Sequence, residues 1–223
     1  MPPLKNIVPT AYVNRAEFFL ERCRGRRVLH LGCVGFTDAS VEDKVRLARE
    51  SLHAKLSAVC DCTGVDLDAV TVEQLRAAGI FQNVLIGDVE RLDDCAGKLP
   101  LFDLVVAGDI IEHLSNPGLM LDGVRRVLKP GGSLLVSTPN ALSLPSFLRH
   151  VRGTFREGNQ HALSFNAITL AQLLERHGYT VAQALTCHHA LAPRLNPLTF
   201  RTGVTFFRAF PKFGGTLLFE ARA

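Results

Sequence analysis

Residues 26–35, RRVLHLGCVG, decide the fold. Residues 27–31 form a short apolar run typical of a buried strand. Gly32 and Gly35 follow in a turn where glycine lets the backbone approach a ligand closely. Outward from this stretch, short apolar runs alternate with longer helical patterns, which predicts parallel strands joined by helices. The expected strands are 27–31, 63–67, 83–86, 102–107 and 133–137, and the expected helices are 40–56, 69–78, 119–128 and 167–177.

The regular alternation stops after residue 140. Residues 141–165 interrupt it, and such segments often carry substrate contacts. Two closing strands are expected at 179–187 and 216–221, joined by an irregular connection. We therefore expect one α/β domain over residues 1–223 with a doubly wound, largely parallel sheet. Its accessory parts are a helical extension at 1–25 and two substrate-side segments at 141–165 and 188–213.

The composition fits a single cytoplasmic domain. A chain of 223 residues with 47% apolar residues can bury its own core. We find neither a secretory leader nor an apolar run of about 18 residues, so we expect no membrane insertion. The six cysteines form no CxxC pair and are expected to be free thiols. A net charge of +4 is too small to demand a nucleic-acid partner, and the sequence leaves the oligomeric state open.

Three groups of residues lie just after consecutive strands, where open α/β sheets bind their ligands. The glycine turn follows the first strand. Asp66, within GVDLD, follows the second and can accept hydrogen bonds from two ribose hydroxyls. Asp88, within GDVERL, follows the third and suits an adenine edge. A dinucleotide site is the competing interpretation, but the turn lacks the full GxGxxG pattern, so a phosphate-free cofactor is favoured.

Six segments in this order resemble the class I S-adenosylmethionine-dependent methyltransferases. They are VLHLGC (28–33), GVDLD (64–68), GDVERL (87–92), FDLVVAGDIIEHLSNPG (102–118), LKPGGSLLVSTPN (128–140) and LAQLLERHGYTV (170–181). The resemblance implies a Rossmann-like, seven-stranded sheet, mostly parallel with the last strand antiparallel, and helices on both faces. It also implies S-adenosyl-L-methionine as the cofactor. The predicted cofactor-binding residues are Gly32, Cys33, Gly35, Asp66, Leu67, Asp88, Val89 and Gly108.

Two positions depart from the family pattern. His30 stands where the family usually has an acidic residue, and Val34 replaces a common glycine. The contacts to the amino acid end of the cofactor therefore cannot be carried over from the family.

Asp109, Glu112 and His113 follow strand 102–107, on the same edge of the sheet as the cofactor residues. Spacings of three and four put them on one face of a helical turn, from which they can converge on a divalent cation. His161 can fold over the same edge as a fourth ligand or as a base. In the alternative interpretation, Asp109 caps the helix while Glu112 and His113 line a pocket that uses no metal.

This turn resembles that of the metal-dependent O-methyltransferases of ubiquinone biosynthesis and of the small-RNA 3′-terminal 2′-O-methyltransferases. In those families a later histidine joins an acidic-x-x-Glu-His turn, and the metal binds two neighbouring hydroxyls of the acceptor. The resemblance implies that Asp109, Glu112, His113 and His161 hold Mg²⁺ or another divalent metal, with His161 and His113 as catalytic residues. A metal lowers the pKa of a bound oxygen, and a histidine can take its proton.

We therefore predict an O-methyltransferase acting on a hydroxyl of a carbohydrate or glycoside. The acceptor is expected to be a small molecule or oligosaccharide with a vicinal diol, and a methylated mannoside is one candidate. Two alternatives stay open. One is methylation of a terminal RNA ribose, which the late histidine favours and the absence of an added RNA-binding domain disfavours. The other is a partner subunit that binds the cofactor without catalysis.

Overall fold

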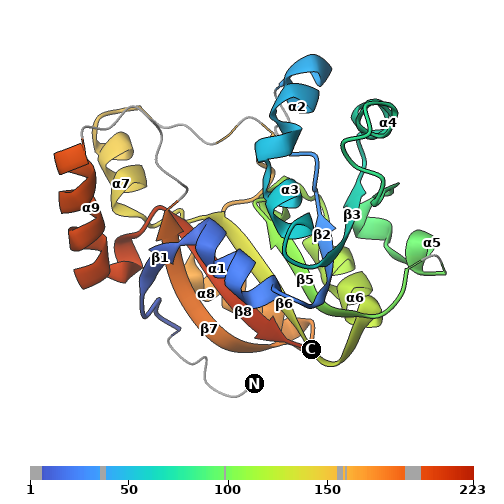
Figure 1. Cartoon of the computed structure of the whole chain (residues 1–223). Coiled ribbons are helices and arrows are strands. Elements are labelled where there is room, and N and C mark those ends of the chain that lie inside the picture. The colour runs from blue at the N-terminus through green and yellow to red at the C-terminus, as the bar shows by residue number, and fades with distance from the viewer. Residues whose placement is uncertain (1–6, 36–38, 98, 155–157, 159, 189–196) are drawn as a thin grey trace.

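A single sheet of eight strands organises the chain (Figure 1). The computed structural model describes residues 7–35, 39–97, 99–154, 158, 160–188 and 197–223. The strands are β1 (Tyr12–Asn14), β2 (Arg27–Leu31), β3 (Asp61–Asp66), β4 (Val84–Ile86), β5 (Phe102–Gly108), β6 (Leu128–Pro139), β7 (Thr180–His188) and β8 (Thr216–Arg222). Their order in the sheet is β1-β7-β8-β6-β5-β2-β3-β4. β8 runs antiparallel to β6 and β7, and the other neighbours are parallel.

The α-helices and short 3₁₀ turns connect these strands. The α-helices are α1 (Arg15–Cys23), α2 (Val41–Leu47), α3 (Leu52–Ser57), α4 (Ala69–Ala77), α5 (Asp93–Ala96), α6 (Pro117–Val127), α7 (Leu144–Val151), α8 (Ala167–Arg176) and α9 (Pro197–Ala209). The 3₁₀ turns are η1 (Ala48–Glu50), η2 (Val89–Arg91), η3 (Ile111–His113) and η4 (Pro211–Phe213).

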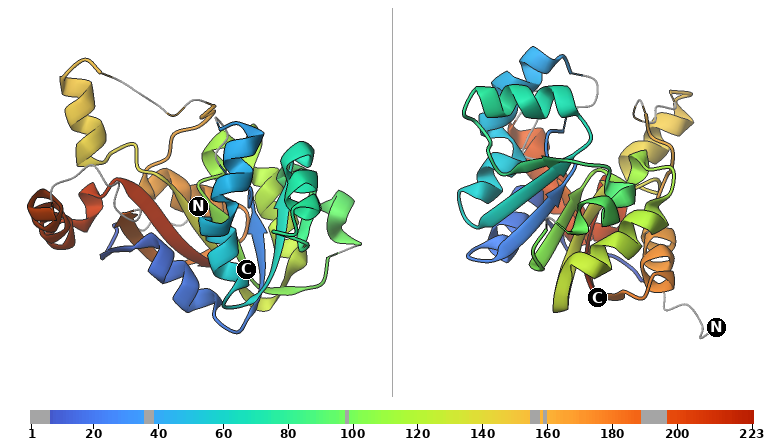
Figure 2. Two further views of the ribbon diagram at one scale, coloured as in Figure 1. Left: turned by 45° about the horizontal axis from the view of Figure 1, so that its top comes forward. Right: turned by 90° about the vertical axis from the view of Figure 1, so that its right-hand side faces the viewer.

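Helices cover both faces of the sheet, as the sequence predicted (Figure 2). On one face, α6 and α8 pack Leu121 and Leu170 against β2, β5 and β6. On the other face, α1 and α3 pack against the same strands, and Phe19 of α1 is fully buried. Successive strand residues point to opposite faces, so Leu29 belongs to the first core and Val28 to the second. The sheet is therefore the buried middle layer of the domain.

The expected seven strands are present, but the sheet has an eighth. The short strand β1 lies in the segment expected to be a helical extension, and it pairs with β7 at the edge of the sheet. Asn14 ends β1 and starts α1, because its side-chain oxygen accepts hydrogen bonds from the amides of Ala16 and Glu17. Residues 1–6 of that extension lie outside the described residues.

Two further expectations need correction. The helix expected over 40–56 is broken, because the side chain of Ser51 caps a new helix by accepting a hydrogen bond from the amide of Ala54. The connection expected to be irregular contains helix α9 between β7 and β8. Residues 189–196 of that connection lie outside the described residues. Among the helices that the structure describes, none has the length and apolar character needed to cross a membrane.

The N-terminal helix should be part of the folding core. Phe19→Ala removes a fully buried ring, so we expect the free energy of unfolding to fall by about 3–5 kcal/mol in urea titrations. Phe18, the partly buried neighbour on the same helix, is the matched control, and Phe18→Ala should cost less. Equal losses for the two variants would contradict the packing of α1 described above.

Candidate active site

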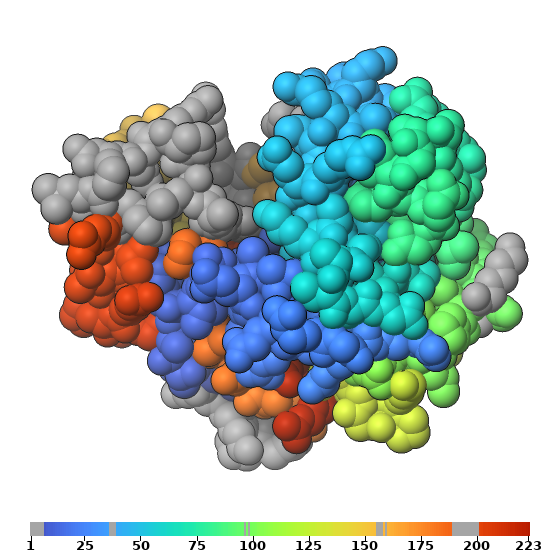
Figure 3. Space-filling view, in the orientation of Figure 1, coloured from blue at the N-terminus to red at the C-terminus, as the bar shows by residue number. Residues whose placement is uncertain are grey.

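A cavity of about 810 Å³ opens at the carboxyl ends of β2, β3 and β5. Its volume falls within the range of about 300–1,000 Å³ typical of small-molecule sites. Figure 3 shows the molecule hollowed beside the cyan surface of α2 and α3, whose residues Lys44 and Leu52 form one wall. Every residue that the sequence predicted to bind the cofactor lines this cavity: Gly32, Cys33, Gly35, Asp66, Leu67, Asp88, Val89 and Gly108.

Asp66, the last residue of β3, is hydrogen-bonded to the turn that follows β2. Its carboxylate accepts hydrogen bonds from the amide of Val34, at 2.8 Å, and from the amide of Asp68, at 3.0 Å. A carboxylate oxygen has a second lone pair, so Asp66 can still accept hydrogen bonds from a diol. Leu67 beside it is 70% exposed and offers an apolar surface to the cavity.

The turn after β2 requires glycine. Gly32 has a φ of 63°, and a Cβ atom there would lie 2.5 Å from Cδ1 of Ile110. The left-handed backbone disfavours any residue with a side chain, and a side chain there would also have to displace the end of Ile110. This position therefore fixes the turn that the sequence placed at the cofactor.

Arg15 is a cavity residue that the sequence analysis missed. Its guanidinium forms an ion pair with Asp109, with Nη2 and Oδ2 3.0 Å apart, and donates from Nε to Oγ of Ser137 at 2.9 Å. Ser137 in turn donates to Oδ1 of Asp109 at 2.8 Å. The available signal was Asn14, a helix-capping residue type just before Arg15, but nothing local connects α1 with β5.

Asp109, which the sequence predicted to be a metal ligand, has other partners in this structure. Asp109 directly follows β5 and has a φ of 53°, in the left-handed region, so it does not start a helical turn. Its carboxylate therefore meets Arg15 and Ser137. Within the part of the chain that the structure describes, the group able to hold a metal contains Glu112, His113 and His161 without it.

Glu112, His113 and His161 are brought together as the sequence predicted. Each offers a ligand atom within 4.8 Å of those of the other two. The rings of His113 and His161 meet edge to face, with centroids 4.7 Å apart. Glu112 and His113 come from η3, whereas His161 comes from the segment that follows α7. A distant segment therefore completes the group.

Backbone hydrogen bonds hold that segment over η3. The amides of Ala162 and Leu163 both donate to the carbonyl of Glu112, at 2.8 and 3.0 Å. Nδ1 of His113 lies 3.2 Å from the carbonyl oxygen of Gln160. A carbonyl can only accept, so Nδ1 carries the proton and a neutral His113 has its lone pair on Nε2. Metal-binding histidines commonly have this arrangement, with the second nitrogen donating to a carbonyl.

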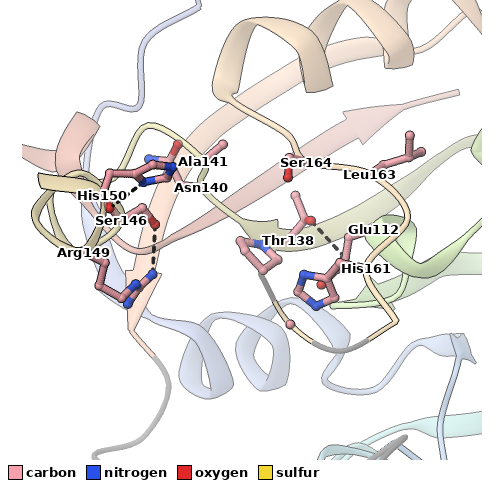
Figure 4. Close-up of a pocket in the computed structure, with 12 residues that line it drawn as sticks. Glu112, Thr138, Asn140, Ala141, Ser146, Arg149, His150, His161, Leu163 and Ser164 are labelled. Carbon is pink, nitrogen blue, oxygen red and sulfur yellow. Dashed lines mark hydrogen bonds between the residues drawn. The ribbon is translucent and has the colours of Figure 1, made fainter. Parts of the chain in front are cut away.

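Glu112 is the buried charge of the group, with an exposed fraction of 2%. The pKa of its carboxyl is raised to about 7: burial raises it most and the nearby Asp109 adds to this, while a backbone hydrogen bond and the hydroxyl of Thr138 lower it. The hydroxyl of Thr138 donates to Oε2 at 2.9 Å (Figure 4). A bound cation or a proton therefore neutralises Glu112 at low cost.

Part of this group also lines a second cavity, of about 170 Å³ (Figure 4). Glu112 and His161 line it, together with Ser146 and Arg149 of α7. His113 lines the larger cavity instead. The three side chains therefore stand at the junction of the two cavities.

A pair of buried imidazoles, those of His30 and His53, lies at the larger cavity. His30 lines the cavity, and its Nδ1 is 3.3 Å from Nδ1 of His53 on α3. Burial lowers the pKa of His53 to about 4 and that of His30 well below the usual range, with His53 and Arg15 also lowering the pKa of His30. Both rings are therefore neutral at physiological pH.

The fold places this cavity beyond the carboxyl ends of the parallel strands, where open α/β sheets bind their ligands. Residues 12–184 match the family model described as a methyltransferase domain. The chain therefore belongs to the methyltransferase domain family, and its fold and relatives are those of class I S-adenosylmethionine-dependent methyltransferases, as the sequence predicted.

Curated relatives support this family. A probable S-adenosylmethionine-dependent methyltransferase of Mycolicibacterium smegmatis is 31% identical over 75% of this chain and 57% of its own. The ubiquinone biosynthesis O-methyltransferase of Xylella fastidiosa (strain 9a5c) is 29% identical over 58% of this chain and 48% of its own. The chain thus spans about half the length of these relatives.

Solved structures share the fold. A S-adenosylmethionine-dependent methyltransferase from Archaeoglobus fulgidus aligns with a TM-score of 0.53 and 18% identity, over 93% of this chain and 94% of its own. Magnesium protoporphyrin IX methyltransferase from Synechocystis, with bound S-adenosylhomocysteine, aligns with a TM-score of 0.54 and 13% identity, over 93% and 81%.

Asp66 should control cofactor affinity. We expect Asp66→Ala to weaken S-adenosylmethionine binding in calorimetry by about 10- to 100-fold, because hydrogen bonds to a charged group and the order of the glycine turn are lost. Asp61, an exposed carboxylate at the other end of β3, provides the control, and Asp61→Ala should bind normally. Unchanged binding by Asp66→Ala would place the cofactor elsewhere.

The buried imidazoles should make stability depend on pH. Between about pH 6.5 and pH 4 the unfolded chain protonates His53 while the native chain does not, so stability falls as the pH falls. The full loss from His53 is about 3 kcal/mol. Glu112, whose pKa is raised, acts in the opposite direction over part of this range. The measurement is therefore the difference between wild type and His53→Phe in urea unfolding at about pH 7 and about pH 5, and identical pH slopes would refute the burial of a neutral His53.

Proposed function

We propose that the chain transfers the methyl group of S-adenosylmethionine to a hydroxyl of a carbohydrate or glycoside carrying a vicinal diol, with a divalent metal and a histidine base. A mannoside of the methylated-polysaccharide type is one candidate acceptor. The position of Glu112, His113 and His161 at the junction of the two cavities carries the proposal. The larger cavity takes the cofactor, and the smaller takes the acceptor.

The three side chains suit a divalent cation. One carboxylate and two imidazoles leave coordination positions open for two acceptor oxygens and water. The lone pair on Nε2 of His113 is oriented by the hydrogen bond to Gln160. The ubiquinone biosynthesis enzyme among the relatives is an O-methyltransferase by name, which favours a hydroxyl acceptor. Mg²⁺ is the proposed ion.

The chain's own residues would position the reactants and move the proton. Methyl transfer from a sulfonium depends mainly on alignment of the methyl group with the nucleophile. In the proposed arrangement, the methyl group passes from the larger cavity to an acceptor in the smaller one. When bound, the metal would lower the pKa of the acceptor hydroxyl. His161 lines the acceptor cavity and either ligates the metal or takes the hydroxyl proton. Thr138 holds the carboxylate of Glu112 in place.

The metal requirement can be measured directly. Methyl transfer to mannosides and to catechol, detected as S-adenosylhomocysteine release, should stop in EDTA and return when Mg²⁺ is restored. The loss follows from removing the charge that acidifies the hydroxyl. Full activity in the chelator would rule out the metal while leaving the cofactor site intact.

His161 should be needed for turnover. We expect His161→Ala to lower kcat by about 10²-fold or more, with S-adenosylmethionine affinity unchanged, because a ligand or base is lost. His177, which follows α8, pairs with Asp122 and lines neither cavity, is the matched control. If the kcat of His161→Ala equalled that of His177→Ala, His161 would have no role in catalysis.

A further inference from the structure

His30 occupies the wall of the cofactor cavity where the family usually has a carboxylate. Its exposed fraction is 3%, and its ring stacks on that of His53 with centroids 5.5 Å apart and planes inclined by 23°. A neutral imidazole cannot replace a carboxylate by charge. It can replace it as a hydrogen-bond acceptor, provided that the lone pair faces the cavity.

The hydrogen bonds behind His30 decide where its proton lies. The amide nitrogen of Asn83 donates to the carbonyl of Cys62, so the amide oxygen of Asn83 faces Nε2 of His53, 3.4 Å away. Nε2 of His53 must therefore donate, and in a neutral ring Nδ1 is then the acceptor. The thiol of Cys62 lies 3.7 Å from the same Nδ1, and its pKa is raised by its hydrogen bond with Cys60 and by burial, so the thiol stays protonated.

Which nitrogen of His30 carries the proton follows in the same way. Its Nδ1 lies 3.3 Å from the accepting Nδ1 of His53, so it carries the proton. The other nitrogen, Nε2, then has the lone pair. Because Nδ1 is committed to His53, Nε2 is the polar ring atom that His30 has left for the cavity it lines.

Arg15 indicates which part of the cofactor this lone pair meets. The guanidinium of Arg15 lines the same cavity and lies close enough to His30 to lower its pKa. This guanidinium already pairs with Asp109, but its remaining N–H groups can donate to the α-carboxylate of the cofactor, whose α-amino group sits on the same carbon atom. Asp66 is the predicted acceptor for the ribose hydroxyls in the same cavity. The α-amino group, on the carbon atom that carries the carboxylate, is a donor that the lone pair of His30 can meet.

We propose that His30 binds the α-amino group of S-adenosylmethionine through a bare Nε2, and that His53 is the positioning residue that fixes this tautomer. The interaction is a neutral substitute for the acidic residue of related enzymes. It rests on the cofactor of the family and is independent of the proposed metal and acceptor.

Paired ligands separate this role from simple packing. S-adenosylhomocysteine carries the α-amino group, whereas 5′-methylthioadenosine lacks the whole amino acid. In calorimetry, His30→Phe should weaken S-adenosylhomocysteine by about tenfold or more and leave 5′-methylthioadenosine unchanged. His30→Gln, whose amide oxygen reaches the place of Nε2, should retain most of the affinity, and His53→Phe should resemble His30→Phe.

Equal losses for both ligands, or no loss in His30→Phe, would overturn the proposal. If wild type bound neither ligand, the cofactor assignment itself would fail, and that result is distinguishable from a defect confined to the amino acid end.

The wild-type protein allows a second measurement that does not depend on a variant folding. Long-range ¹H–¹⁵N correlation spectra of the imidazoles should show His30 protonated on Nδ1. Addition of S-adenosylhomocysteine should shift the Nε2 resonance of His30, and 5′-methylthioadenosine should not. A proton on Nε2, or an Nε2 resonance indifferent to S-adenosylhomocysteine, would contradict the proposed contact.

Discussion

The parallel pairing of β2 with β3 on one side and β5 on the other is the constraint on which the site depends. Leu31 pairs with Val65 and with Ala107, so three strands end at the same level of the sheet. Their loops then share one edge, as in other open α/β sheets. The glycine turn, Asp66 and η3 come together for this reason, although they are far apart in the sequence.

Sequence predicted this part well because its signals are local. Apolar runs and glycine turns mark each strand and its end within a few residues, and parallel pairing then places all strand ends together. Every predicted cofactor residue consequently lines one cavity. Glu112 and His113 were placed correctly for the same reason. His161 joined them through backbone hydrogen bonds to Glu112, which no sequence spacing encodes, so its position came from the family resemblance.

The errors arose where long-range contacts decide the backbone. A non-glycine residue with positive φ is uncommon, so the helical spacing of Asp109 with Glu112 suggested a shared face that the left-handed Asp109 does not have. Its partner Arg15 lies on a helix that reaches the cavity only because Phe19 buries α1 against the sheet. The extra strand β1 is three residues long and depends on β7 for its hydrogen bonds, so it has no signal of its own.

The proposed function requires the methyl group of the cofactor to lie beside the proposed metal ligands. Measurements of binding or turnover alone do not test this placement. Paramagnetic relaxation measures this directly. With Mn²⁺ bound, the S-methyl signal of ¹³C-labelled S-adenosylmethionine should broaden far more than its adenine signals, and the effect should vanish in His161→Ala. Adenine signals broadened as much as the methyl signal, or a methyl signal unaffected by Mn²⁺, would contradict the placement of the metal between cofactor and acceptor.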